Sequence, residues 1–152
     1  SQMSLNSMHE IVTEIKIDAS PDKVWGVLTD FARYPEWNPF IRQLSGEAVR
    51  GHQLTASICP PGGKAMTFHP KVLVAEANTE LRWLGRLLFP GLFDGEHYFL
   101  LSPLAPGQTH LIHGEKFSGI LLPLLKSQLE SGTRAGFEAM NQALKARAES
   151  AS

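Results

Sequence analysis

Two histidines and a glutamate late in the chain carry its clearest potential for chemistry. His97 lies in residues 95–104, and His113 and Glu115 lie in residues 108–117. Both segments favour β-strands, and the short Pro/Gly-rich connector between them is typical of a hairpin. Alternate side chains of a strand share a face, and opposed residues of an antiparallel pair share it too. We therefore expect His97 to lie opposite His113 or Glu115 on one inward, otherwise apolar face.

Several kinds of chemistry are compatible with this set. A histidine bonded to Glu115 can be purely structural, because buried polar groups are usually hydrogen-bonded. The set can orient a hydroxyl or carbonyl of an apolar ligand. It can also move a proton, since histidine titrates near pH ~6.5 and burial beside a carboxylate shifts both groups. The catalytic residues stay unknown at this stage, with His97, His113 and Glu115 as candidates.

Two imidazoles and one carboxylate also match the ligand sets of non-haem iron and zinc sites. Strand alternation alone produces such triplets often, however, and nothing else in the sequence points to a metal. We expect neither a metal nor a cofactor.

The bulk composition indicates one globular domain. At 152 residues with 43% hydrophobic content, the chain is long enough to bury about 70% of its unfolded surface. The net charge is −1 with both signs interspersed, which argues against a nucleic-acid partner. No apolar run approaches the roughly 20 residues of a membrane span, so we expect no integral membrane segment.

The ends and the single cysteine add weaker expectations. Residues 1–8 are predicted to be a disordered lead or a non-native remnant without the pattern of a secretion signal, and residues 9–149 to form the domain. Cys59 is the only cysteine, so an internal disulfide is impossible. A cytoplasmic location is the simplest expectation.

The order of elements predicts an α+β fold. Residues 10–18 alternate as a half-buried strand, and a helix follows from Ser20, with a second short helix at residues 30–34. Further strands are expected before the histidine hairpin, with connectors of hairpin length, at residues 42–50, 53–59, 67–77 and 80–86.

The end of the chain changes period and predicts one long amphipathic helix over residues 119–148. Its apolar stripe comprises Leu121, Leu125, Leu129, Gly132, Gly136, Met140 and Ala143. An antiparallel sheet covered by one long helix is an α+β arrangement.

Several motifs resemble the START-like or SRPBCC superfamily, which includes polyketide cyclases/dehydrases and lipid carriers. The resemblance rests on IDASPDKVW at 17–25, LTDF at 28–31, YPEWNPF at 34–40, Gly46, Gly51, LRW at 81–83, GEH at 95–97 and EKFSG at 115–119. It covers nearly the whole chain. It implies a helix-grip fold, in which a seven-stranded antiparallel sheet curves around the C-terminal helix and encloses a hydrophobic cavity. It carries no shared catalytic motif, so the role of the histidine set rests on strand alternation alone.

The expected function is binding of a small hydrophobic, partly oxygenated ligand of the lipid, polyketide or isoprenoid class, by a monomer or homodimer. The alternatives are a cyclase/dehydratase-type enzyme with a His/Glu acid–base pair, and a partner-binding module similar to chaperone activators.

The expected ligand-binding residues are Trp37, Phe40, Trp83, Phe89, Phe93, His97, Phe99, His113, Glu115, Phe117, Leu125, Leu129, Gly132 and Gly136. In most soluble domains aromatic residues like these are simply part of the core. The apolar connector at residues 89–93 can be a lid or a loop tucked onto the sheet edge. The two glycines can leave room for a ligand or allow close helix–sheet packing.

Overall fold

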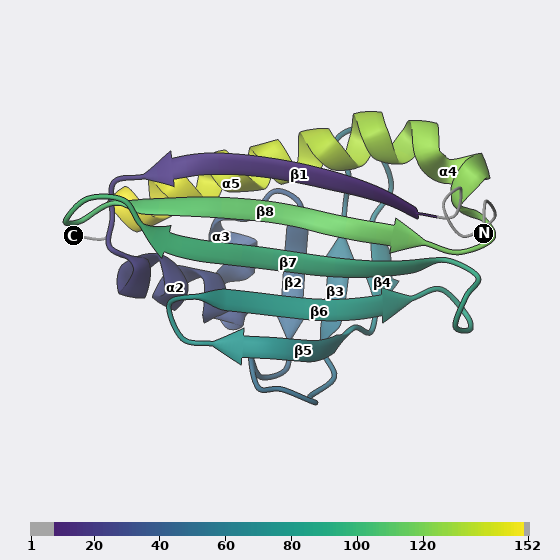
Figure 1. The fold of residues 1–152 in the computed structure, drawn as a ribbon, viewed down its shortest axis with the longest axis horizontal. Coiled ribbons are helices and arrows are strands. Elements are labelled where there is room, and N and C mark those ends of the chain that lie inside the picture. The colour runs from purple at the N-terminus through teal and green to yellow at the C-terminus, as the bar shows by residue number, and fades with distance from the viewer. Residues whose placement is uncertain (1–7, 151–152) are drawn as a thin grey trace.

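The computed structural model describes residues 8–150, so residues 1–7 of the predicted lead at 1–8 lie outside the described residues, while Met8 begins the first strand. Figure 1 shows a curved antiparallel sheet with a long helical segment laid across it. The first part of the chain comprises β1 (Met8–Ile17), α2 (Pro21–Thr29), the 3-10 turn η1 (Phe31–Arg33) and α3 (Tyr34–Trp37). Then follow β2 (Ile41–Ser45), β3 (Thr55–Ile58), β4 (Met66–Phe68), β5 (Lys71–Glu76), β6 (Glu80–Arg86), β7 (Asp94–Pro103) and β8 (Thr109–Ser118).

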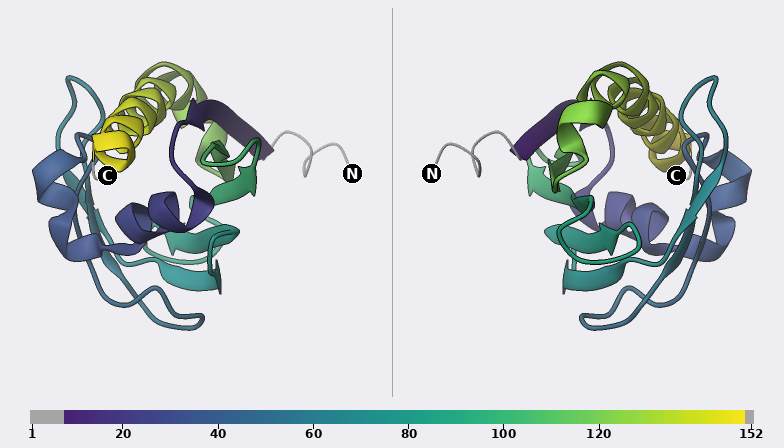
Figure 2. Two further views of the ribbon diagram at one scale, coloured as in Figure 1. Left: turned by 90° about the vertical axis from the view of Figure 1, so that its left-hand side faces the viewer. Right: turned by 90° about the vertical axis from the view of Figure 1, so that its right-hand side faces the viewer.

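The strands form two hydrogen-bonded groups. One sheet has the order β1-β8-β7-β6-β5, and the other has the order β2-β3-β4. A bridge between Gln53 and Lys71 joins them, supported by the Leu54 amide donating to the Pro70 carbonyl at 2.7 Å. Seen along the strands in Figure 2, the two sheets and the C-terminal helix surround a common interior.

The strand count differs from the prediction in one place. Residues 67–77 were expected to form one strand, but they contribute to two, β4 and β5, separated at His69 and Pro70. Proline has no amide hydrogen to donate and fits badly within a ladder. The chain therefore turns here from one sheet into the other, which gives eight strands instead of seven.

The C-terminal helix is interrupted by a wider turn. It comprises α4 (Leu122–Gln128), a π-helical turn η2 (Leu129–Thr133) and α5 (Arg134–Ser150). It begins later than predicted, because Gly119 has a positive φ of +122° and lies too close to Leu92 for any side chain. None of the helices within residues 8–150 combines the length and the apolar character of a membrane-spanning helix.

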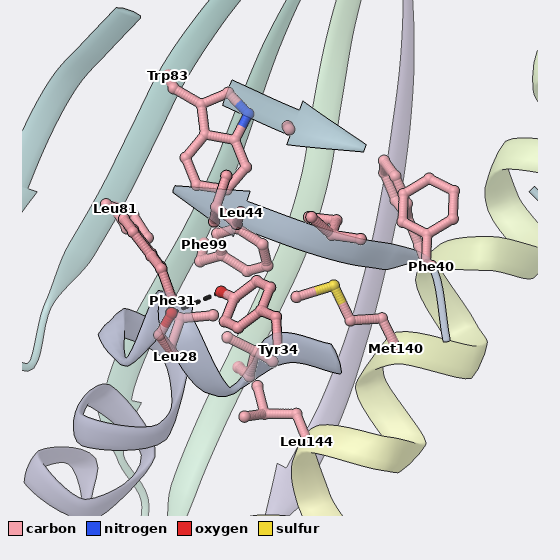
Figure 3. Close-up of a cluster of buried hydrophobic side chains, with 14 of the residues drawn as sticks. Leu28, Phe31, Tyr34, Phe40, Leu44, Leu81, Trp83, Phe99, Met140 and Leu144 are labelled. Carbon is pink, nitrogen blue, oxygen red and sulfur yellow. Dashed lines mark hydrogen bonds between the residues drawn. The ribbon is translucent and has the colours of Figure 1, made fainter. Parts of the chain in front are cut away.

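The core lies between α5, α2 and the concave face of the large sheet (Figure 3). Tyr34 is fully buried there, and its hydroxyl donates to the Leu28 carbonyl at 2.5 Å. Phe99 from β7 and Met140 from α5 are also fully buried. This packing holds the sheet and the helix at a fixed separation, which positions the polar groups described next.

Candidate functional site: a buried histidine chain

The hairpin of β7 and β8 brings the predicted polar set together. His97 pairs directly with Glu115, and Phe99 pairs with His113. The prediction that His97 faces His113 or Glu115 across the hairpin is therefore confirmed. Both histidines are buried, with exposed fractions of 1% and 0%, whereas the Glu115 side chain is 16% exposed. The set thus runs from the protein interior to a partly open end.

The polar contacts form one continuous chain. Glu115 Oε1 lies 3.2 Å from His97 Nδ1, and His97 Nε2 lies 2.7 Å from His113 Nε2. His113 Nδ1 lies 2.8 Å from Asn141 Oδ1 on α5. Asn141 Nδ2 donates to Thr13 Oγ1 on β1, also at 2.8 Å, and Thr13 donates to the His113 carbonyl oxygen. We call Glu115, His97, His113, Asn141 and Thr13 the histidine chain.

Aromatic rings enclose the two imidazoles. His113 stacks between Phe137, at 4.1 Å between ring centroids, and Phe99, at 4.4 Å. His97 stacks on Trp83 at 5.1 Å. These rings surround the imidazoles, and each imidazole nitrogen has a neighbour in the histidine chain as its polar partner.

This environment keeps His113 neutral. Burial lowers the pKa of His113 well below its ordinary value of 6.5, and repulsion by His97 adds to the effect. The hydrogen bond with Asn141 acts in the opposite direction on the pKa but does not outweigh burial. The inner histidine is therefore uncharged at neutral pH.

The lowered pKa of His113 predicts a pH-dependent stability. Below about pH 6.5 the unfolded chain binds a proton at His113 that the folded chain does not, so the free energy of unfolding falls as pH falls. This contribution approaches about 1.4 kcal/mol per pH unit below that point. We expect His113→Gln to show a shallower decline than the parent between about pH 6.5 and 5 in urea unfolding. Identical declines would show that folded His113 takes up the proton.

The expected ligand-binding residues divide into groups. Trp83, Phe99 and Phe117 are buried on the concave face, and Phe93 stacks on Phe117 with centroids 5.8 Å apart. Phe89, by contrast, is 54% exposed, so the connector at residues 89–93 directs one phenylalanine inward and the other outward. Trp37 is half-buried on α3, where its ring packs on Tyr34.

The two helix glycines differ from one another. A methyl group on Gly136 would collide with the ring of Phe40, so Phe40 fills the room that the missing side chain leaves. At Gly132, in the π turn, the nearest atom to such a methyl group would be Pro60 Cβ at 3.9 Å. Leu125 and Leu129 on the same side are only half-buried. The helix therefore packs closely at Gly136 and less closely at Gly132 and in the half-buried stretch before it.

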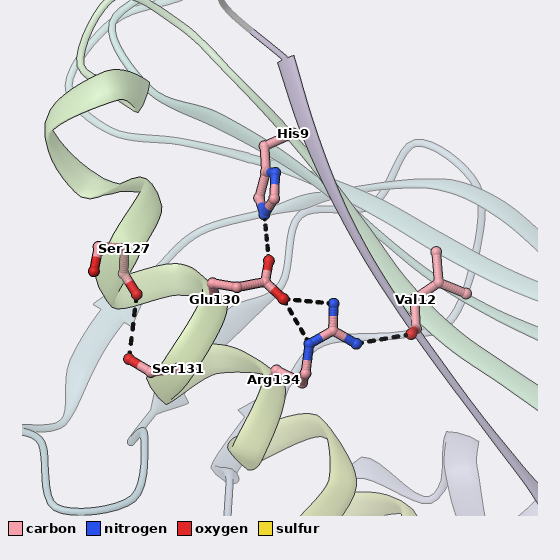
Figure 4. A network of polar contacts seen from close by, with 6 residues as sticks. All are labelled: His9, Val12, Ser127, Glu130, Ser131 and Arg134. Atoms are coloured by element: carbon pink, nitrogen blue, oxygen red, sulfur yellow. Dashed lines mark hydrogen bonds and ion pairs between the residues drawn. The ribbon is translucent and has the colours of Figure 1, made fainter.

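A polar network holds this looser part of the helix to β1 (Figure 4). Glu130 contacts His9 Nε2 at 2.6 Å and accepts from Arg134 at 2.7 Å, and Arg134 donates to the Val12 carbonyl at 3.2 Å. Hydrogen bonds from Arg134 and His9 lower the pKa of Glu130. The π turn is thus fixed to the sheet edge through side chains at the surface.

Three members of the site were not singled out from the sequence. Thr13 was assigned to an alternating strand but given no role, while Asn141 and Phe137 fell outside the predicted stripe. The spacing of Phe137, Met140, Asn141 and Leu144 is helical and would have placed Asn141 on the buried face. The sequence did not indicate which residues the buried Asn141 amide would contact.

Two hollows on the protein surface lie away from the histidine chain. One of about 480 Å³ is lined by Pro35, Asn38, Arg42, Gln43 and Ser57, beside α3 on the outer face of the small sheet. A second of about 280 Å³ adjoins it. Neither includes a residue of the histidine chain. Within residues 8–150, no group of three or more histidine, cysteine or acidic residues is arranged to hold a metal ion.

Comparison with known families assigns the chain to one of them. The model of the family described as "Polyketide cyclase / dehydrase and lipid transport" matches residues 8–149. The chain belongs to this family. Its α+β helix-grip fold and its place in the START-like superfamily agree with the expectation from the motifs. No curated protein sequence matches the chain significantly.

Solved structures share the fold at low sequence identity. The di-domain aromatase/cyclase StfQ from the steffimycin biosynthetic pathway has a TM-score of 0.79 and 15% identity, with 98% of this chain and 54% of StfQ covered. The chain thus spans about half of StfQ. The Zhui aromatase/cyclase from Streptomyces sp. R1128 has a TM-score of 0.77 and 16% identity, with 93% of this chain and 94% of Zhui covered. A START superfamily protein from Mycobacterium smegmatis has a TM-score of 0.73 and 21% identity, covering 95% and 99%.

Proposed function

We propose that the protein binds a small hydrophobic, oxygenated molecule between the large sheet and the C-terminal helix, with Glu115 as its polar contact. The observation that carries this proposal is the partly exposed Glu115 carboxylate at the end of a buried polar chain, on an otherwise aromatic face. A carboxylate there is costly to desolvate unless it has partners. A ligand hydroxyl supplies such a partner.

The surroundings of Glu115 suit an apolar molecule. Phe117 lies two residues further along β8 on the same face and stacks on the half-buried Phe93. Leu125 and Leu129 are half-buried on the C-terminal helical segment, where Gly132 has no side chain. Covering these groups with a ligand would contribute affinity at about 25 cal/mol per Å² of apolar surface removed from water. π turns occur frequently at functional sites, which agrees with entry beside η2.

The most direct test is native mass spectrometry of the protein purified gently from its own host. We expect a stoichiometric apolar adduct whose mass identifies the ligand class after solvent extraction. Repeated absence of an adduct across growth conditions, together with no binding of an aromatic alcohol such as 2-naphthol, would contradict the proposal.

A single methyl group tests the role of Glu115 without removing it. A Cβ on Gly95 would collide with Glu115 Oε2, the far end of a flexible side chain, so Gly95→Ala should displace the carboxylate without moving the backbone. We expect the affinity for 2-naphthol to fall about tenfold, and the free energy of unfolding to fall by about 1–3 kcal/mol because buried His97 Nδ1 loses its partner. Fluorescence titration and urea unfolding measure the two quantities.

The matched control is Gly85→Ala on the neighbouring strand. Gly85 pairs directly with Gly95, and a methyl group there would meet only Pro70 Cβ at 3.8 Å, an ordinary contact. Affinity should therefore be unchanged in this variant. Equal losses in both variants would mean that the carboxylate position is irrelevant to binding.

The histidine chain also favours a second candidate, an enzyme of the cyclase/dehydratase type. Two of the structural relatives are described as aromatase/cyclases, and the family description includes cyclases. Here Glu115 would take a proton from a carbon next to a ketone as the electron pair moves onto the ketone oxygen. Glu115→Gln would then lower the turnover of a poly-β-ketone substrate by about a hundredfold or more, whereas a carrier would lose only affinity.

A further inference from the structure

The positions of the hydrogen atoms in the histidine chain can be worked out in order, starting from the His113 carbonyl oxygen. The His113 carbonyl oxygen can only accept a hydrogen bond, so the Thr13 hydroxyl donates its one proton to it. Thr13 Oγ1 must then accept from the neighbouring amide, which directs the Asn141 NH₂ toward Thr13. Asn141 therefore presents its carbonyl oxygen to His113, and the choice between the two amide orientations is fixed by the network.

The same reasoning continues outward through both imidazoles. Because Asn141 Oδ1 can only accept, His113 Nδ1 carries a proton. The contact at 2.7 Å between the two Nε2 atoms needs one proton as well, since two bare imidazole nitrogens would repel each other. Glu115 Oε1 and His97 Nδ1, at 3.2 Å, need a third proton for the same reason. Two neutral imidazoles supply only two protons.

We infer that Glu115, His97 and His113 together hold three protons and carry no net charge, with the third proton shared between Glu115 and His97. The Glu115–His97 pair is then either an acid beside a neutral imidazole or a carboxylate beside an imidazolium. In both forms the proton lies on the Oε1 side of the carboxyl group. Among residues 8–150, the other oxygen, Oε2, has no hydrogen-bond partner, and it is the atom that lies over Gly95.

This arrangement specifies the ligand class, and it rests on the proposed function. Oε2 can only accept a hydrogen bond, so the site selects a molecule that brings a donor, such as a phenol, an alcohol or an amine. A ketone or an ether of the same size offers no hydrogen and is disfavoured. Thr13 and Asn141 are positioning residues in this account, because they fix the hydrogen positions without facing the ligand.

The proton arrangement is testable without any ligand. In protein labelled with ¹⁵N-histidine, long-range ¹⁵N–¹H correlation spectra at pH 7 distinguish the two imidazole nitrogens. We expect His113 to carry its proton on Nδ1 with a bare Nε2, assigned by comparison with His113→Gln. Thr13→Val should remove this preference, which a merely structural role for the hydroxyl would not do. A proton on His113 Nε2 with a bare Nδ1 in the parent would overturn the inference.

Ligand selection is tested with the matched probes 2-naphthol and 2-methoxynaphthalene. We expect the naphthol to bind about tenfold tighter or more, because only the naphthol donates a hydrogen bond to Oε2, and Glu115→Leu to reduce this preference to near one. Glu96→Gln is the control, because Glu96 lies next to His97 on the opposite face of β7 and pairs with Arg82. It should keep the preference.

The outcomes separate the two proposals. Equal binding of both probes by the parent would overturn the inference about the ligand class and leave the proposed function standing. Binding of neither probe would overturn the ligand class, and together with the absence of a co-purified adduct it would contradict the proposed function. The proton arrangement would still be decided by the spectra.

Discussion

Replacing Asn141 by leucine is expected to lower the free energy of unfolding by about 2–4 kcal/mol. The substitution keeps a side chain of similar length but removes the acceptor of His113 Nδ1 and the donor to Thr13 Oγ1. Each buried polar group left without a partner costs about 1–3 kcal/mol. Urea unfolding at pH 7 measures the loss.

The control for Asn141→Leu is Gln142→Leu, one residue further along the same helix. Gln142 is exposed, so its replacement should change stability by less than about 0.5 kcal/mol. A loss below about 0.5 kcal/mol for Asn141→Leu itself would mean that the hydrogen bonds of Asn141 to His113 and Thr13 do not contribute to stability.

Replacing Phe40 by alanine is expected to be still more destabilising, by about 3–5 kcal/mol. Phe40 is 3% exposed, packs edge-on against Phe137 at 5.5 Å and occupies the space above Gly136. Its removal leaves an apolar void of the kind that binds small aromatic molecules. Excess benzene should therefore restore part of the lost stability, because a ligand that binds only the folded state stabilises it.

Phe89→Ala is the matched control for Phe40→Ala. Phe89 is more than half exposed, so its truncation should leave stability nearly unchanged and create no response to benzene. Thermal unfolding with and without benzene compares the two variants. No recovery in Phe40→Ala would indicate that the helix collapses onto the sheet, and that Gly136 serves close packing alone.

The sequence predicted the hairpin at the site well because strand alternation is a local rule. Once residues 95–104 and 108–117 are strands joined by a short connector, the face shared by His97, His113 and Glu115 follows. The first strand and the α+β order were predictable for similar reasons. The division at Pro70 was not, because proline is compatible with an edge strand, a bulge or a break, and only the position of the second sheet decides between them.

The contacts of Asn141 with His113 and Thr13 were not predictable from local patterns. Asn141 meets His113 across 28 residues, and it meets Thr13 across 128. These contacts depend on how the helix crosses the sheet. The filling of the space at Gly136 by Phe40 has the same origin, because a glycine in a helix indicates close approach without indicating which residue approaches.

The most direct test of the central claim is a map of where 2-naphthol binds. Backbone ¹⁵N–¹H spectra recorded during a titration should show the largest shifts at Gly95, Glu115 and Gly132, and the shifts should weaken in Gly95→Ala. The account predicts no comparable change at Arg42 and Ser57, which line the outer hollow beside α3. Shifts confined to that hollow, with Glu115 and Gly132 unaffected, would contradict a ligand site between the sheet and the helix.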